Sequence, residues 1–202
     1  MSDAVQNTLS QDIAFVRALA EEGRNRPYRG SIGLASGLIW GTASLYSWSV
    51  VSKAWVSPLG AESAGWVWLA AAIVSAVAGI PLGMYRGRPD SNRMAVAAWG
   101  SVGVACWTIS AAVIVAGVRT HAGVVFALLP PMIMAIYGGA WFMSSMAFKA
   151  RWQLWVGGLC VLSSLVLAYV AAQPIELLLF ALALYGFAGL PGLIAVLRAR
   201  RS

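Results

Sequence analysis

Six mostly apolar stretches, separated by short polar segments, run through this chain. They lie near residues 31–52, 63–84, 94–117, 122–143, 152–172 and 175–197. Each is close to the roughly 20 residues that a helix needs to cross the hydrocarbon core of a bilayer. No Asp, Glu, Lys or Arg lies near the middle of any of them. The pattern therefore predicts six transmembrane helices, which form one membrane domain over residues 31–197.

The first stretch carries a row of small residues. Gly33, Gly37 and Gly41 recur every fourth residue and Ser44 extends the row, so all four lie on one helical face. Lipid tails gain nothing from a glycine, whereas a neighbouring helix can approach closely there and gain van der Waals contact. We expect this face to pack against another helix. The sequence leaves open whether that helix belongs to the same chain or to a second copy.

The links between the stretches are short. Residues 119–121 join the third stretch to the fourth, and Gln173-Pro174 joins the fifth to the sixth. Short links make consecutive helices antiparallel neighbours, which predicts three tandem hairpins. The expected fold class is an all-α integral membrane protein, a bundle of six transmembrane helices without a soluble domain on either side.

Residues 1–30 form a polar head. Thr8 and Gln11 match the capping-box pattern, and apolar residues then recur at helical spacing over about residues 9–22. This predicts an amphipathic helix that lies on the cytoplasmic membrane surface or closes that end of the bundle. The head lacks the apolar run of a signal peptide, so we expect the first stretch to act as its own insertion signal.

The start of the chain resembles a class of bacterial proteins. The run from Phe15 to Arg24, followed by a glycine-rich stretch, is similar to the beginning of many small bacterial membrane proteins. Three tandem hairpins in a chain of 202 residues also resemble small six-span bacterial stress-associated proteins in architecture. These resemblances imply no particular chemistry. The absence of an N-x-S/T sequon fits a bacterial origin.

Basic residues are divided unequally between the two sides of the predicted bundle. With the N-terminus in the cytoplasm, only Lys53 and Arg119 fall outside. The other twelve fall inside, namely Arg17, Arg24, Arg26, Arg29, Arg86, Arg88, Arg93, Lys149, Arg151, Arg198, Arg200 and Arg201. Positive charge of this kind marks the cytoplasmic side. We therefore expect both termini in the cytoplasm, with residues 198–202 as a basic tail, and a location in the bacterial inner membrane.

Composition supports the membrane class and excludes another. Hydrophobic residues make up 60% of the chain, charged residues 10%, and the mean hydropathy is +0.76. These values are typical of a polytopic membrane protein and not of a soluble domain. The net charge of +7 is spread over the links and forms no single basic patch. We therefore exclude a nucleic-acid partner and expect the lipid bilayer as the surroundings.

Pro130 and Pro131 lie inside the fourth predicted span. A proline removes a backbone donor and clashes with the carbonyl four residues back. The pair therefore predicts a bend whose freed carbonyls face protein or a wet cavity, and Tyr137, two turns further along, is placed to line the same space. The bend is either a hinge at a binding site or a fixed kink that improves packing.

Trp40 and Trp107 lie near mid-span, away from the tryptophans expected at the two membrane interfaces. A buried indole N–H needs an acceptor, so we expect both rings to point into the bundle. There they fill core space or line a pocket for a flat hydrophobic molecule. Cys106 and Cys160 lie at similar depth. Without a histidine or carboxylate beside them, they are not expected to bind a metal.

Polar groups offer little for catalysis. Arg119, His121 and Glu176 fall in outer turns, where they form a small polar mouth or are simply solvated. Hydroxyls at depth, such as those of Ser44 and Ser164, are expected to bond back to carbonyls of their own helix. A serine nucleophile needs a general base, and the single histidine is in a turn. We therefore expect no catalytic residues.

The sequence thus favours a non-enzymatic inner-membrane protein that acts by helix–helix association. It would be a homo-oligomer or an accessory subunit of a membrane assembly, packed through the face from Gly33 to Ser44. One alternative is a passive channel or carrier for a small neutral or hydrophobic solute, gated at the two prolines. Another is a binder of a hydrophobic cofactor or lipid near Trp40 and Trp107. The sequence does not indicate which cofactor this would be.

Overall fold

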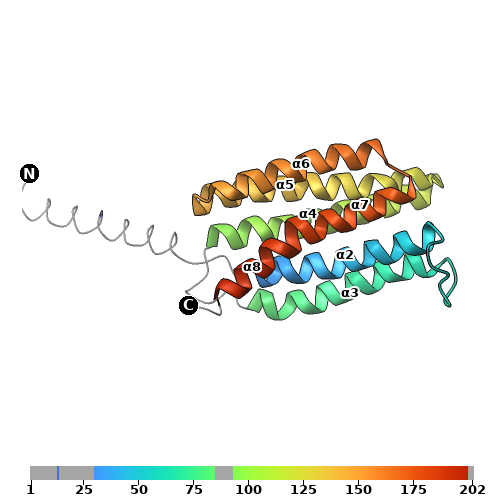
Figure 1. Cartoon of the computed structure of the whole chain (residues 1–202), viewed down its shortest axis with the longest axis horizontal. Coiled ribbons are helices and arrows are strands. Elements are labelled where there is room, and N and C mark those ends of the chain that lie inside the picture. The colour runs from blue at the N-terminus through green and yellow to red at the C-terminus, as the bar shows by residue number, and fades with distance from the viewer. Residues whose placement is uncertain (1–12, 14–29, 85–92, 200–202) are drawn as a thin grey trace, which may run out of the picture.

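A computed structural model describes residue 13, residues 30–84 and residues 93–199 of the chain. All regular structure in these parts is helical (Figure 1). The amphipathic helix expected over residues 9–22 lies outside the described residues, apart from Ile13. The link at 85–92 and the tail from residue 200 onward also lie outside them.

Six helical segments follow one another. They are α2 (Ser31–Val51), α3 (Ser63–Met84), α4 (Arg93–Thr120), η2 (Gly123–Leu128) continued by α5 (Leu129–Phe148), α6 (Arg151–Tyr169), and α7 (Pro174–Leu184) continued by η3 (Tyr185–Gly189) and α8 (Leu190–Ala199). Consecutive segments run in opposite directions (Figure 1). Two segments change helix type along their length, since η2 is a 3-10 helix and η3 is a π-helix.

Four helices among the described residues are long and apolar enough to cross a membrane. They are Trp99–Thr120, Gly123–Met146, Arg151–Tyr169 and Pro174–Arg198, and they indicate that the chain is integrated in a membrane. The described apolar part of α3, Ser63–Val77, is shorter. The helix α2 is not among the four, because five serines and one threonine lower its hydropathy.

The helices do not pack as three separate hairpins. The helix α2 lies between α3 on one side and the α7–η3–α8 segment on the other, so the first and last segments are neighbours (Figure 1). The helix α5 packs closely on α6 and also contacts α4. By contrast, α6 and α7 pack only lightly although their link is very short. Adjacency of two helices in the sequence therefore does not determine whether they pack together.

The hydrophobic core lies where α5, α6 and the sixth segment meet. Its largest fully buried side chains are Met134, Trp141, Leu167, Phe180 and Leu184. The helices around this core keep their outer surfaces apolar, as expected for helices whose solvent is lipid. The core therefore holds α5 and α6 against the α7–η3–α8 segment, which also packs on α2.

Four turns contain a residue other than glycine in the left-handed backbone region. These residues are Lys53, His121, Lys149 and Ala172, with φ between 50° and 66°. Ala172 bonds its N–H to the Glu176 carboxylate. Lys53, His121 and Lys149 follow the end of a helix, where a left-handed residue can direct its N–H back to the last helical carbonyls. The N–H of Lys149 bonds in this way to the carbonyl of Ser145. These caps let the chain reverse direction within a few residues.

Candidate functional site

The row of small residues on α2 is buried inside the chain. Its members are Gly33, Gly37, Gly41 and Ser44. The row packs along the sixth helical segment. A Cβ atom at Gly37 would collide with the backbone N and Cα of Gly189, and one at Gly41 would lie 2.7 Å from the Tyr185 ring. Two copies could associate through this face only if the crossing opened, because its partner is in the same chain.

Hydroxyl groups reinforce the contacts between helices. Ser44 donates a hydrogen bond from Oγ to the carbonyl of Leu177 at 2.7 Å, across the α2–α7 contact. Ser164 of α6 donates from Oγ to the carbonyl of Pro131 in α5, also at 2.7 Å. The expectation that these two hydroxyls bond within their own helix is therefore wrong, because each donates to a carbonyl of a neighbouring helix. Each such bond contributes about 0.6 kcal/mol on average in a membrane.

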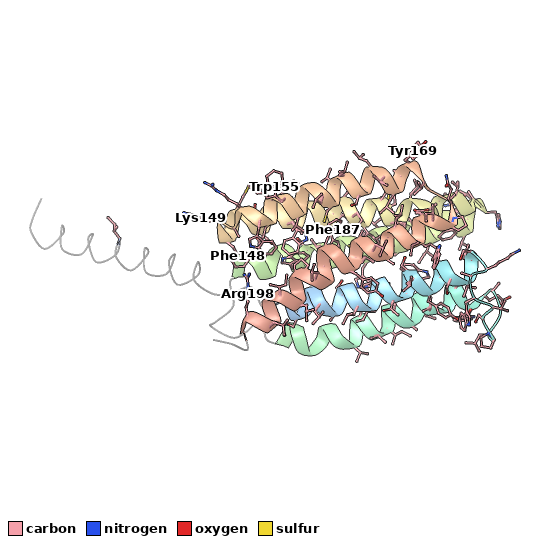
Figure 2. The ribbon with its side chains drawn as sticks, in the orientation of Figure 1. Phe148, Lys149, Trp155, Tyr169, Phe187 and Arg198 are labelled. Carbon is pink, nitrogen blue, oxygen red and sulfur yellow. The ribbon has the colours of Figure 1, made fainter. Side chains whose placement is uncertain are left out.

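The π-helix η3 lies where the sixth segment crosses α2. The hydroxyl of Tyr185 and Oγ1 of Thr42 form a hydrogen bond of 2.9 Å. On α5, the fully buried Trp141 donates its indole N–H to the carbonyl of Phe187 at 3.1 Å, and Figure 2 labels Phe187 at this crossing. Hydrogen bonds thus connect the π-helix η3 to both α2 and α5. Short π-helical segments occur frequently at functional sites.

Tyr137 lies at the centre of a cluster that joins α2, α4 and α5. Its hydroxyl forms a hydrogen bond of 2.7 Å with Oγ of Ser36. Its ring meets that of Trp99 edge-on, with 5.8 Å between the ring centroids. Trp99 also meets Trp141 edge-on at 5.1 Å and donates its indole N–H to Oγ of Ser144 at 3.0 Å. The cluster fixes the relative positions of three helices.

Trp40 and Trp107 have different surroundings. Trp40 packs against the core and against Trp68 of α3, with 5.9 Å between the ring centroids. Trp107 is 50% exposed on the outer side of α4, so the expectation that it points into the bundle is wrong. No ring contact joins it to Trp40 within the described parts of the chain. The side that α4 turns inward instead carries Val102, Cys106, Ile109 and Val113.

Pro130 and Pro131 lie in the first turn of α5. The 3-10 helix η2 precedes them, and the N–H of Leu129 bonds to the carbonyl of Phe126. N–H groups in a first helical turn have no partner within the helix, so prolines cost no hydrogen bond there. The prolines therefore start an α-helix and do not interrupt one. The helix changes from 3-10 to α just before the two prolines.

Glu176 differs from the other two charged residues expected at the outer surface. Arg119 and His121 are exposed at the end of α4, whereas Glu176 is only 3% exposed. Its Oε2 accepts the N–H of Ala172 at 2.8 Å, and its Oε1 is buried without a partner. Glu176 is therefore a buried cap of the α6–α7 turn and neither a solvated residue nor part of an open mouth. The signal in the sequence is its position in the first turn of a helix that starts at Pro174, where the helix dipole favours a negative charge.

Gln153 is a second buried polar residue, and the sequence pattern alone did not single it out. It is almost completely buried near the start of α6, and its Oε1 has no hydrogen-bond partner. Gly157 and Cys160 are buried on the same helix. The spacing of four and three residues places all three on the face toward α5, and this spacing was the available signal.

The described residues offer few groups for catalysis or metal binding. Within them, no three His, Cys, Asp or Glu side chains come together. Cys106 and Cys160 are free thiols. The hollows found in the described parts are shallow, one between α2 and α3 and another on α4. Comparison with protein-family models, curated proteins and solved structures finds no match. The packing of the helices is therefore the guide to function.

Proposed function

We propose that this chain is an inner-membrane protein of six transmembrane helices that acts by helix–helix association and not as an enzyme. It works as a homo-oligomer or as a subunit of a larger membrane assembly. The observation that carries the proposal is the one-sided packing of α3 and α4. The helix α3 packs chiefly on α2, and α4 packs on η2 and α5. Both helices leave a broad apolar face outside.

The outer face of α4 supports association with another helix. Small residues there form a shallow hollow, lined by Ala111, Ala112, Val115 and Ala116. Lipid tails gain little from small side chains, whereas a neighbouring helix can approach closely over them. A row of small residues on an outward face is therefore better matched to protein than to lipid.

Two segments outside the four long apolar helices are included in the proposed six spans. The helix α2 packs along the α7–η3–α8 segment, and α3 packs along α2. Helices packed along a spanning helix share its depth in the bilayer. No charged residue interrupts α2, or α3 between Ser63 and Met84, so both satisfy the demands of a lipid environment.

Charge supports an orientation with both termini in the cytoplasm. Lys149 and Arg198 lie at the same end of the bundle in Figure 2. The turns that carry Lys53 and Arg119 lie at the opposite end (Figure 1). An excess of basic residues marks the cytoplasmic side. The resemblance of the first residues to bacterial membrane proteins favours the bacterial inner membrane.

Native mass spectrometry of protein extracted gently from its own membrane tests the proposal. A mass at an integer multiple of 21.3 kDa supports a homo-oligomer. A larger mass that is not a multiple indicates other subunits, whose identity then gives the assembly. A monomer that is free of partners under several mild detergents would refute association as the mode of action.

A further inference from the structure

We infer that copies of this chain associate by packing α3 of one copy against α4 of the next, an inference that rests on the proposed function. Two exposed faces form the pair. The α3 face carries large side chains below an acidic residue, and its members are Glu62, Trp66, Leu69, Ile73 and Val77. The α4 face carries smaller side chains below a basic residue, and its members are Arg119, Val115, Ala112, Thr108 and Val104.

Each set follows one side of its helix, with Glu62 in the turn just before α3. The α3 face follows spacings of four, three, four and four residues, which keep side chains on one stripe of an α-helix. The α4 face follows the same spacings in the reverse direction. All ten residues are exposed in the single chain. Trp66, the largest of them, is 66% exposed. Both stripes are therefore accessible to a partner along their length.

The two stripes match in depth. The turns that carry Glu62 and Arg119 lie at the same end of the bundle (Figure 1), and α3 and α4 run in opposite directions. With a rise of about 1.5 Å per residue, Trp66 and Val115 both lie about 6 Å below the charged pair. Leu69 and Ala112, three residues further along their helices, again lie at the same depth. Large side chains thus face the shallow hollow of small ones.

The charges select this pairing over a symmetric one. Neither Glu62 nor Arg119 has an ion-pair partner among the described residues. A two-fold contact of α3 with α3 would place one Glu62 beside another, and a contact of α4 with α4 would do the same for Arg119. Packing α3 on α4 pairs opposite charges instead. Such a head-to-tail contact closes into a ring when the rotation between copies permits.

Cysteine cross-linking tests the contact directly. Leu69→Cys and Ala112→Cys are made in separate, differently tagged copies, which are then co-expressed and oxidised in the membrane. A disulfide-linked dimer of the two tags should form in the mixture, at least about tenfold above the wild-type background from the native thiols. Each variant expressed alone should remain at that background. Leu162→Cys on the exposed side of α6 replaces Ala112→Cys in the matched control pair.

Charge reversal provides a second readout. Glu62→Arg and Arg119→Glu should each lower the association constant in native membranes by about tenfold, because an attraction becomes a repulsion. The double variant should recover most of the loss, since the pair is restored with its signs exchanged. Both positions are exposed, so the fold of the single chain should survive either change.

The outcomes separate this inference from the proposed function. A mixed-tag dimer together with charge rescue supports the α3–α4 contact. Strong cross-linking of one variant with itself indicates a symmetric contact and overturns the inference. An oligomer by native mass spectrometry without mixed cross-links shows that association uses another face, so the inference fails while the proposed function stands. A monomer refutes both.

Discussion

Gly37 marks the closest approach between α2 and the sixth segment, and one added methyl group tests that crossing. We expect Gly37→Ala to destabilise the protein because the new Cβ would meet the backbone N and Cα of Gly189. It would also lie 3.0 Å from the carbonyl oxygen of Leu184. Backbone atoms within two helices cannot turn aside as a side chain does, so the helices must separate.

Gly139→Ala is the matched control. A Cβ at Gly139 has nothing within 4 Å. Both substitutions gain about 1 kcal/mol of helix propensity, and this gain cancels in their difference. Overpacking costs about 1–3 kcal/mol. We therefore expect Gly37→Ala to be less stable than Gly139→Ala by about 1–3 kcal/mol, which is about 5- to 150-fold in the ratio of folded to unfolded protein.

Steric trapping in detergent micelles measures the free energy of unfolding of both variants. Gly41→Ala should lie between them, because its nearest neighbour is the Tyr185 ring, which can rotate if it gives up the bond to Thr42. If Gly37→Ala and Gly139→Ala agree within about 0.5 kcal/mol, the usual error of such differences, the crossing is not as close as described.

Five further substitutions test three individual hydrogen bonds in the same assay. Ser36→Ala and Tyr137→Phe remove opposite partners of one bond, so a double-mutant cycle should give a coupling of about 0.6–1.7 kcal/mol, and strict additivity would contradict the bond. Trp141→Phe should cost about 1–3 kcal/mol, because the partly buried Phe187 carbonyl loses the indole donor; an unchanged free energy would show that another donor replaces it. Glu176→Ala should cost a similar amount, since the N–H of Ala172 loses its acceptor. Glu176→Gln keeps an acceptor and removes a buried charge, so it should be at least as stable as the wild type, and a glutamine variant as unstable as the alanine variant would refute this account.

The positions of the helices could be predicted from the sequence, because apolar runs and charged links alternate clearly. The helices α2 and α3 begin at Ser31 and Ser63, where the polar segments before them end. The row from Gly33 to Ser44 also indicated a close helix contact, since small residues are of little use against lipid. Both inferences depend on local composition, which a single sequence contains.

Long-range contacts could not be predicted in this way. The partner of the glycine row depends on how the first and last segments meet, and no local pattern encodes that meeting. Trp107 looked like a core residue by depth alone, but depth does not say which side of α4 faces inward. Glu176 looked like a solvated turn residue, yet the fold buries it as a cap. The helix-type changes at η2 and η3 also have no counterpart in the apolar pattern of the sequence.

The crossing of the first and last segments has a consequence for synthesis of the chain. Gly41 contacts Tyr185, and at about 5–20 residues per second roughly 7–30 s pass between the translation of these two residues. During that interval the glycine face of α2 is without its native partner. A chain that stalls before residue 185 keeps this face uncovered. The uncovered face therefore distinguishes a chain that has been translated past residue 185 from one that has not.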